Sequence, residues 1–308
     1  MKIFTMALES QPNMSIDLSH IKIEEKPFEG EMYDVMQGSA RWEVKVHDHG
    51  LVALTDVMPR MAPVGKTADF AIVQAARVSY GAGTKQVNED RGLVRYLARH
   101  RHTTPFEMVE FKFHHVMPIF IARQWVRHRT ANINEYSARY SVVQDRFYHP
   151  DLANVRKQST ANRQGGEEPT DHATAQEFLN YLDKVEESYK DYQRLMDKGV
   201  AREIARIGLP LNVYTEWYWK IDLHNLFHFL SLRMDAHAQQ EIRDYATAMY
   251  ALIQPIVPVA AEAFLDYNFG ALHLTRLEVE ALKTREPLAT ENNREIAEWE
   301  EKKKRLGL

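Results

Sequence analysis

The hydrophobic positions along the chain follow two patterns, one typical of strands and one of helices. Four stretches have the alternation or the short apolar run of a strand: 42–46, 51–54, 109–115 and 213–221. Apolar residues recur at helical spacing over seven others: 67–80, 88–100, 118–127, 170–195, 200–207, 222–234 and 236–253. The two types do not alternate regularly, as they do in a doubly wound parallel sheet. We therefore predict an α+β fold, in which a mixed or antiparallel sheet is packed with long helices.

Residues with capping chemistry mark the expected starts of several helices. Thr67 and Thr170 precede helical patterns and are predicted N-caps, because a hydroxyl oxygen can accept a hydrogen bond from a free backbone N–H group. The segment 104–107, Thr-Pro-Phe-Glu, has the pattern of a capping box with proline in the first turn. Pro118 is predicted to open the helix that follows the strand 109–115.

The predicted elements form a single large domain with an extension at each end. Residues 1–40 show no sustained period and are interpreted as an N-terminal extension wrapped on the surface. Residues 41–270 form the main domain, and the polar stretch at about 151–169 is interpreted as a loop insertion within it. Residues 271–308 form a charged tail. Acidic and basic residues four apart within 290–308 predict that the tail ends in a solvated helix.

Composition excludes several classes of protein. Hydrophobic residues make up 44% of the 308 residues and charged residues 27%, as in a folded protein. A net charge of −4 argues against a protein that coats nucleic acid, which needs a basic surface. The chain has no cysteine, so disulfides, thiolate-bound metals and a cysteine nucleophile are excluded. No apolar run has the length of a signal peptide or a membrane span, and we expect a cytoplasmic protein that does not bind membranes.

The strongest chemical signal is a basic segment at residues 121–140. It holds four arginines (123, 127, 129 and 139) but a single acid, Glu135, in an acidic chain. Guanidinium groups suit phosphate, so the segment is expected to bind an anion. An ion-pair cluster with Glu135 is the structural alternative, but it would leave most of the bases unpaired. A functional alternative is an RNA- or single-strand-binding module that stacks bases on Trp125, Tyr136 and Tyr140; the acidic net charge speaks against it.

Other polar residues add a second basic set and a group of histidines. Arg206 lies on a short apolar helix, whereas Arg233 ends a helix and could simply cap it. The histidines 100, 102, 114 and 115 lack the helical spacing of a zinc site, so we predict no metal, and His102 is interpreted as a polar contact to a ligand or backbone. The glycine-rich fingerprints of Rossmann and P-loop nucleotide sites are both absent.

Together these residues resemble the flavin-dependent thymidylate synthases. The family signature, Arg-His-Arg followed after seven residues by Ser, is met by Arg127, His128, Arg129 and Ser137, and its longer form is met except at Asn132. The resemblance runs from about residue 50 to 270 and includes five further motifs: Ala76-Arg77-Val78-Ser79, His102 to Glu107, Pro118 to Trp125, Ala205 to Asn212 and Leu232 to Gln239. A degenerate member kept as a structural oligomer is a further alternative, suggested by the departures at Asn132 and Asp222.

The resemblance implies an activity and an assembly. Members methylate dUMP to dTMP with 5,10-methylenetetrahydrofolate as carbon donor, FAD as hydride relay and NADPH as reductant. The absence of cysteine fits this route, because the other thymidylate synthase family attacks uracil with a cysteine thiolate. Members are homotetramers whose sites are shared between subunits, which makes Trp217, Tyr218 and Trp219 candidate interface residues; core packing is the alternative. We expect small-molecule substrates and no nucleic-acid partner.

The resemblance also assigns roles to residues. The expected dUMP contacts are Gln124, Arg127, Glu135, Ser137, Ala138, Arg139, Arg206 and Arg233. Among them, Arg139 and Arg206 would bind the phosphate, and Arg233 is the one catalytic candidate, set against the uracil edge to stabilise negative charge. The expected FAD contacts are Ser79, Thr104, Arg127, His128, Arg129, Thr130, Glu135, His224 and His228. His102 would lie near both flavin and folate. Asp222, His224 and His228 stand where the family often has an Asn-x-Arg pair and a later Asn.

Overall fold

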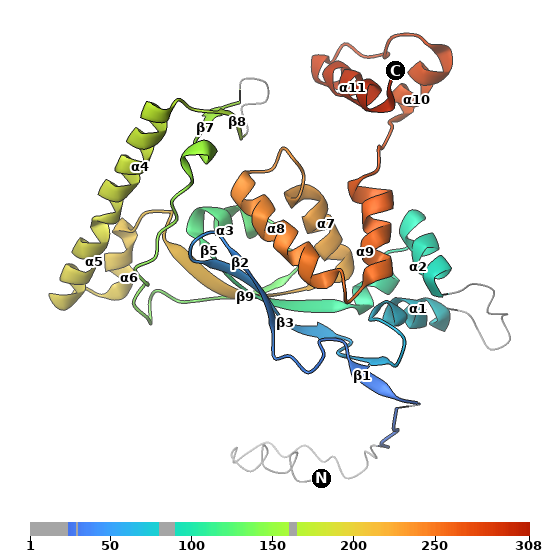
Figure 1. The fold of residues 1–308 in the computed structure, drawn as a ribbon, viewed down its shortest axis with the longest axis horizontal. Coiled ribbons are helices and arrows are strands. Elements are labelled where there is room, and N and C mark those ends of the chain that lie inside the picture. Colours follow the sequence, from blue (N-terminus) through green and yellow to red (C-terminus); the bar gives the residue numbers. More distant parts are fainter. Residues whose placement is uncertain (1–23, 29, 80–89, 160–164) are drawn as a thin grey trace, which may run out of the picture.

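The computed structural model describes residues 24–28, 30–79, 90–159 and 165–308 (Figure 1). Its centre is a five-stranded antiparallel sheet, which confirms the α+β prediction. The strands in spatial order are β2 (Trp42–Val46), β3 (Gly50–Met58), β5 (Glu110–Pro118), β9 (Tyr214–Asp222) and β6 (Asn132–Glu135). The four predicted strands are therefore present as β2, β3, β5 and β9, whereas β6 was not predicted.

Helices cover the sheet and its end. Those nearest the site are α1 (Asp69–Val78), α2 (Asp90–Arg99), the 3-10 turn η1 (Thr104–Met108), α3 (Ile119–Trp125), α7 (Leu223–Arg233), α8 (Gln240–Ile253) and α9 (Pro258–Phe264). Figure 1 shows α7 and α8 across the sheet, with α1, α2 and α9 grouped beyond one end of it. Buried residues of all these elements join one hydrophobic core.

Aromatic rings form the centre of that core. Trp125, at the end of α3, is fully buried, and its ring centroid lies 4.6 Å from that of Phe229 and 5.5 Å from that of Trp219. Trp217 and Trp219 point inward from β9 and are 1% and 2% exposed, whereas Tyr218 between them is 49% exposed. The alternation along β9 thus places the two tryptophans in the core and leaves only Tyr218 as an interface candidate.

The capping predictions were wrong in three places. Ala68, rather than Thr67, is the N-cap of α1, and the Thr67 hydroxyl donates to Asp69 Oδ2 instead. The capping box expected at 104–107 is a 3-10 turn without a side-chain cap. Asp171, not Thr170, caps α4, because its carboxylate accepts from Thr174 N at 2.9 Å. Residue 80, the predicted end of the helix over 67–80, lies outside the described residues.

A buried carboxylate joins two of the helices. Asp69 accepts hydrogen bonds at 3.0 Å from the backbone N–H groups of Val259 and Ala260, at the start of α9. Burial raises the pKa of Asp69, although these donors act in the opposite direction. The contact fixes the N-terminus of α9 against α1, since a buried acceptor and two unpaired donors would each be costly alone.

An outer lobe projects from one side of the sheet (Figure 1). It comprises η2 (Leu152–Asn154), the hairpin β7 (Arg156–Gln158) and β8 (Gly166–Pro169), α4 (His172–Glu186), α5 (Ser188–Asp197), α6 (Arg202–Ala205) and η3 (Arg206–Gly208). The hairpin replaces part of the loop expected at 151–169, and the single helix expected at 170–195 is two helices that meet at Glu187. A separate hydrophobic cluster, which includes Tyr189 and Tyr192, holds the lobe together.

The two ends of the chain are more structured than expected. A short strand, β1 (Met32–Asp34), pairs with β4 (Met61–Pro63), and Met36 is fully buried in the main core rather than wrapped on the surface. At the other end, α10 (Arg276–Thr284) and α11 (Asn293–Leu306) form a hairpin apart from the main body (Figure 1).

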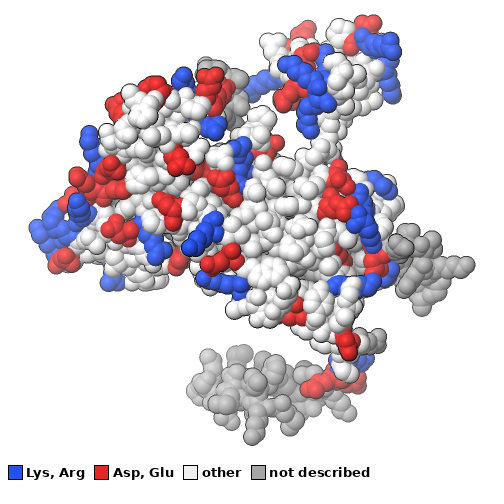
Figure 2. Space-filling model, in the orientation of Figure 1, with Lys and Arg blue, Asp and Glu red and all other residues white. Residues whose placement is uncertain are grey.

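The C-terminal hairpin is not a simple solvated helix. Trp299 is 4% exposed, and Lys302 Nζ lies 2.8 Å from Glu278 Oε1 on the neighbouring helix. Lys302 thus pairs across the hairpin with Glu278, and not with the acidic residue four positions earlier in its own helix, Glu298. Charged side chains crowd the hairpin and the outer lobe, whereas the middle of the same face carries few of them (Figure 2).

Candidate active site

A cavity of about 1200 Å³ opens beside α2, η1 and α7. Its far wall is formed by α9 and by the π-helical turn Leu265–Phe269 that follows it. Phe106, Phe227 and Phe264 contribute apolar surface to the cavity. Because Asp69 fixes the start of α9, the wall on that side is tied to the main core.

Seven residues predicted to contact flavin or folate meet at this cavity. They are His102, Arg127, His128, Arg129, Thr130, His224 and His228. The segment 127–130 directly follows α3, so the buried Trp125 anchors it, whereas His224 and His228 lie one turn apart on α7. Asp222, the departure from the family pattern, caps α7 by accepting from Asn225 N at 2.9 Å. This residue therefore has a structural role in placing the two histidines.

A neutral histidine and an arginine form a pair at the cavity edge. Arg233 Nε donates to His128 Nε2 at 2.9 Å. Burial, the charge of Arg233 and the nearby His228 lower the pKa of His128 to about 4. The imidazole is therefore uncharged near neutral pH and can accept this hydrogen bond. Burial also lowers the pKa of Arg233, but a guanidinium stays protonated, so its remaining N–H groups can serve another acceptor.

The cavity wall carries a large excess of positive charge. Among the described residues, Arg127 and Arg129 form no ion pair. Asp266, the single carboxylate that the described part of the chain places on the wall, lies 2.7 Å from Arg95 and is already paired. A partly buried site with unpaired guanidinium groups attracts anions, and phosphates above all.

The residues predicted to bind dUMP fall into two groups within one chain. Arg127 lines the cavity, and Arg233 donates to His128 on its wall. Gln124, on α3 three residues before Arg127, donates to Gln239 in the segment between α7 and α8. The other group lies toward the outer lobe: Glu135, Ser137, Ala138, Arg139 and Arg206. None of that second group lines the cavity.

The second group has its own local order. Glu135 on β6 accepts a hydrogen bond from the Thr215 hydroxyl at 2.8 Å. It forms no ion pair with any described residue, so the alternative ion-pair cluster around Glu135 is absent from this part of the chain. The Arg139 guanidinium lies over the Tyr140 ring, 5.2 Å from its centroid. Ala138 packs against the hydrophobic cluster of the lobe, and Arg206 begins η3 in the lobe itself.

Three predicted FAD contacts do not line the cavity: Ser79, Thr104 and Glu135, the last of which lies on β6. Ser79 follows α1 and is exposed, and Thr104 lies one residue beyond Thr103, which does line the cavity.

The alternative of a nucleic-acid-binding module loses one of its three proposed stacking platforms, because Trp125 is fully buried and cannot stack on a base.

Several cavity residues were missed by the sequence reasoning. They are Arg99, Arg101, Asn225, Ser231, Tyr267, Asn268 and His273. Ser231 could have been found, since it lies three residues after His228 on the same helix face. Asn225, three residues before His228, shares that signal, whereas the others come from the end of α2, from the π-helical turn and from the segment after it, none of which has a periodic signal.

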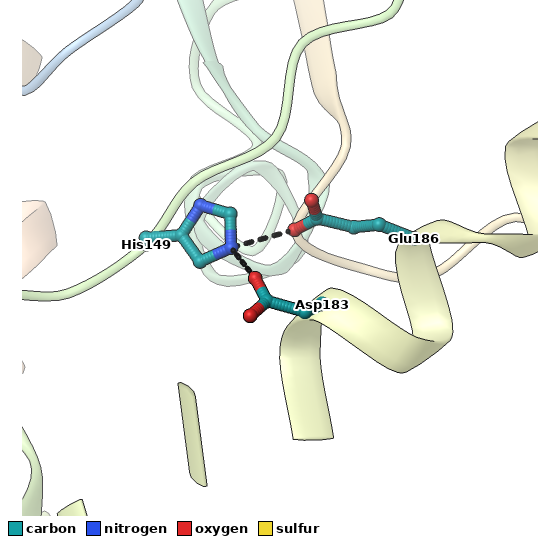
Figure 3. Close-up of side chains that lie close together, drawn as sticks. All are labelled: His149, Asp183 and Glu186. Carbon is teal, nitrogen blue, oxygen red and sulfur yellow. Dashed lines mark ion pairs between the residues drawn. The ribbon is translucent and has the colours of Figure 1, made fainter. Parts of the chain in front are cut away.

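A histidine and two carboxylates meet outside the cavity (Figure 3). His149 Nε2 lies 3.0 Å from Glu186 Oε1 and 3.4 Å from Asp183 Oδ1, and Asn212 donates to Glu186 at 2.8 Å. These are ligand types for a divalent metal, but the Asp183 side chain is 70% exposed and the contacts are those of ion pairs. The group joins the segment before η2 to α4, and the absence of a metal stays a prediction.

Comparisons with known proteins agree with this geometry. A family model described as "Thymidylate synthase complementing protein" matches residues 62–259. A flavin-dependent thymidylate synthase from Dictyostelium discoideum is 70% identical over 294 residues, covering 96% of this chain and 97% of that protein. The protein of the same name from Gluconobacter oxydans is 53% identical over 235 residues, covering 75% of each.

A solved structure shares the fold. The UMP/dUMP methylase PolB from Streptomyces cacaoi, bound with 5-Br UMP, matches with a TM-score of 0.63 and 34% sequence identity. The match covers 73% of this chain and 98% of that one. The chain therefore belongs to the family of flavin-dependent thymidylate synthases.

Proposed function

We propose that the chain methylates dUMP to dTMP and that the cavity described above binds FAD for this reaction. The observation that carries the proposal is the meeting, in one large cavity, of the Arg-His-Arg signature and the two histidines of α7. The activity is that of the family, with 5,10-methylenetetrahydrofolate as carbon donor and NADPH as reductant.

The residues present fit FAD. Its pyrophosphate needs cationic partners, and Arg127 and Arg129 have no partner of their own among the described residues. Its rings need apolar walls, which Phe106, Phe227 and Phe264 supply. When bound, FAD relays hydride from NADPH to the transferred carbon. The chain's own residues must then hold dUMP against it and stabilise charge on the uracil.

Arg233 is the residue that we assign to charge stabilisation. Its Nε is fixed by the neutral His128, so the guanidinium is held in one orientation before substrate binds. A fixed cation beside the uracil N3 and O2 would stabilise negative charge there and make C5 more nucleophilic. Ser137 would contact the nucleotide through a hydrogen bond and not as a nucleophile.

The split of the dUMP contacts supports a site shared between subunits. The surface near Arg139 and Arg206 is apolar: Tyr140, Ile207 and Leu211 are 72%, 75% and 63% exposed. Exposed apolar groups beside functional arginines are typical of a surface that another protein covers. We therefore propose a homotetramer in which a second copy brings this region to the cavity of the first.

Other expectations stay predictions. Among the described residues, no helix is both long and apolar enough to cross a membrane. We retain the cytoplasmic location on the grounds given by the sequence. We also retain 41–270 as the catalytic domain, since the family model lies inside these bounds.

The purified protein is expected to show the visible absorption of a flavin at about one FAD per chain. Adding dUMP should perturb this spectrum, because the two ligands would lie in contact in one site. The measurement is an absorption titration with dUMP, with 2′-deoxyuridine as the control that lacks only the phosphate. A colourless protein that takes up neither FAD nor dUMP would refute the proposed function.

Replacing Arg139 with alanine is expected to raise the KM for dUMP about 10- to 100-fold, because one charge-assisted hydrogen bond contributes about 1.5–3 kcal/mol. The flavin spectrum should not change, since Arg139 is assigned to the dUMP phosphate and not to FAD. Steady-state kinetics at varied dUMP measure the effect. The matched control is Arg294→Ala, which removes the same charge from the exposed surface of the C-terminal hairpin. Loss of flavin in Arg139→Ala would show that this residue serves FAD instead.

A further inference from the structure

The arginines of α2 differ in whether they have acidic partners. Arg91 and Arg95 each lie within 2.7 Å of Glu262, one on the exposed surface and one half-buried. Arg99, two turns beyond Arg91, has no ion pair among the described residues, and it lies 5.9 Å from the centroid of the Tyr267 ring. Arg99 therefore faces the cavity with its charge uncompensated.

A second arginine follows in an unfavourable backbone conformation. The hydrogen bonds His102 N to Leu97 O and Arg101 N to Ala98 O close α2 as a Schellman motif. Arg101 occupies the left-handed position of this motif, with φ of +58°, where glycine is favoured. Its side chain lines the cavity and also has no acidic partner among the described residues. The chain thus carries an arginine at a position where glycine would make the backbone more stable.

The flavin does not account for these two cations. The cavity wall holds the four guanidinium groups of Arg99, Arg101, Arg127 and Arg129, whereas one FAD pyrophosphate carries about two negative charges. The two pairs also come from different elements, the end of α2 and the segment after α3. The volume of about 1200 Å³ exceeds the roughly 300–1,000 Å³ of ordinary ligand pockets, so it can admit part of a second ligand.

The wall beside Arg99 is held in place. Arg95 Nη2 donates to the Tyr267 hydroxyl at 2.8 Å, and its guanidinium lies 4.9 Å from the Tyr267 ring centroid. Tyr267 is thereby fixed before a ligand binds, and it offers Arg99 a cation–π contact. A pre-oriented guanidinium loses less side-chain entropy when an anion binds to it.

We propose that Arg99 and Arg101 form a second anion subsite, which binds the anionic tail of a co-substrate that must reach the flavin. The chemistry is a phosphate or carboxylate group. Two co-substrates carry one: NADPH has a 2′-phosphate and methylenetetrahydrofolate has glutamate carboxylates. The proposal rests on the proposed function, because it takes the flavin to lie in the same cavity.

The test uses the flavin-loaded protein and the variant Arg101→Gly. Glycine suits the left-handed position, so this variant should fold at least as well as the wild type while it lacks the cation. Binding is measured by calorimetry with two pairs of probes. Adenosine 2′,5′-bisphosphate is compared with 5′-AMP, and folate triglutamate with folate monoglutamate. The wild type should prefer the more highly charged probe of at least one pair, the bisphosphate over 5′-AMP or the triglutamate over the monoglutamate. In Arg101→Gly we expect one of these two affinity ratios to fall about tenfold or more.

The pair of probes that is affected shows which co-substrate, NADPH or methylenetetrahydrofolate, supplies the anionic tail. A loss confined to the bisphosphate assigns the subsite to NADPH, and a loss confined to the triglutamate assigns it to the folate. Arg101→Lys should retain part of the preference, because it keeps the charge but not the planar fork. Arg91→Ala is the matched control, since Arg91 lies on the same helix but is paired with Glu262 outside the cavity wall.

Two results would overturn the subsite. Unchanged preferences in Arg101→Gly would show that no anionic tail binds there. Loss of FAD from that variant would show that Arg101 holds the flavin pyrophosphate instead. Failure of the proposed function is a separate outcome, because the wild-type protein run in parallel would then contain no flavin.

Discussion

Replacing Arg233 with alanine is expected to slow dTMP formation by about 10²- to 10³-fold, the usual effect of removing one fixed donor aimed at developing charge. Arg233 is partly buried and oriented by His128, so its charge acts in a less screened setting than a surface arginine. The purified variant should keep its flavin, since Arg127 and Arg129 remain on the cavity wall. Single-turnover formation of dTMP and the flavin content together measure the effect.

A second readout separates this role from a structural one. The charge of Arg233 helps to lower the pKa of His128, so in Arg233→Ala that pKa should rise from about 4 toward its ordinary value. NMR titration of the imidazole would detect the change. Arg233→Lys should keep part of the activity, because the charge remains but the Nε contact to His128 is lost. Unchanged turnover in Arg233→Ala would remove this residue from the mechanism.

The sheet was predictable because its strands carry a clear local signal. Along β9, Trp217 and Trp219 alternate with Tyr218, and the structure buries the first two while leaving the third half-exposed. The short strand β6 was missed, because all four of its residues are exposed and no alternation in burial marks it.

Helix starts were less predictable, because several residues compete for the same role. Thr170 and Asp171 are adjacent and both have capping chemistry, and only the structure shows that Asp171 accepts from Thr174 N. The hydroxyl of Thr67 had a nearer acceptor in Asp69, which is buried to hold the start of α9. That contact joins residues 190 apart in sequence, so no local pattern could reveal it.

The site was predictable where its residues are contiguous. The signature Arg127, His128 and Arg129 reaches the cavity as one segment, and His224 and His228 follow from helical spacing. Arg101 and Tyr267 come to the same cavity only through tertiary packing of α2 against α9. Their positions depend on a left-handed residue and a π-helical turn, which the pattern of apolar residues does not encode.

Replacing Trp125 with alanine is expected to lower the free energy of unfolding by about 3–5 kcal/mol, as for other large aromatic residues removed from a core. Trp125 is fully buried, and its ring packs on those of Trp219 and Phe229, so little of the lost volume can be refilled. Urea unfolding at one fixed protein concentration measures the change, because the stability of the proposed tetramer would depend on concentration.

Two neighbouring substitutions make this result specific. Trp125→Phe should cost less than Trp125→Ala, because the indole Nε1 has no hydrogen-bond partner to lose and a ring remains to pack on Phe229. Val126→Ala, at the next position, whose side chain is 37% exposed, should change stability much less than Trp125→Ala, by about 1 kcal/mol or less. Since Arg127 begins the segment that reaches the cavity, Trp125→Ala should also weaken flavin binding, while Val126→Ala should not. A loss below about 1 kcal/mol in Trp125→Ala would mean that the aromatic cluster does not anchor this segment.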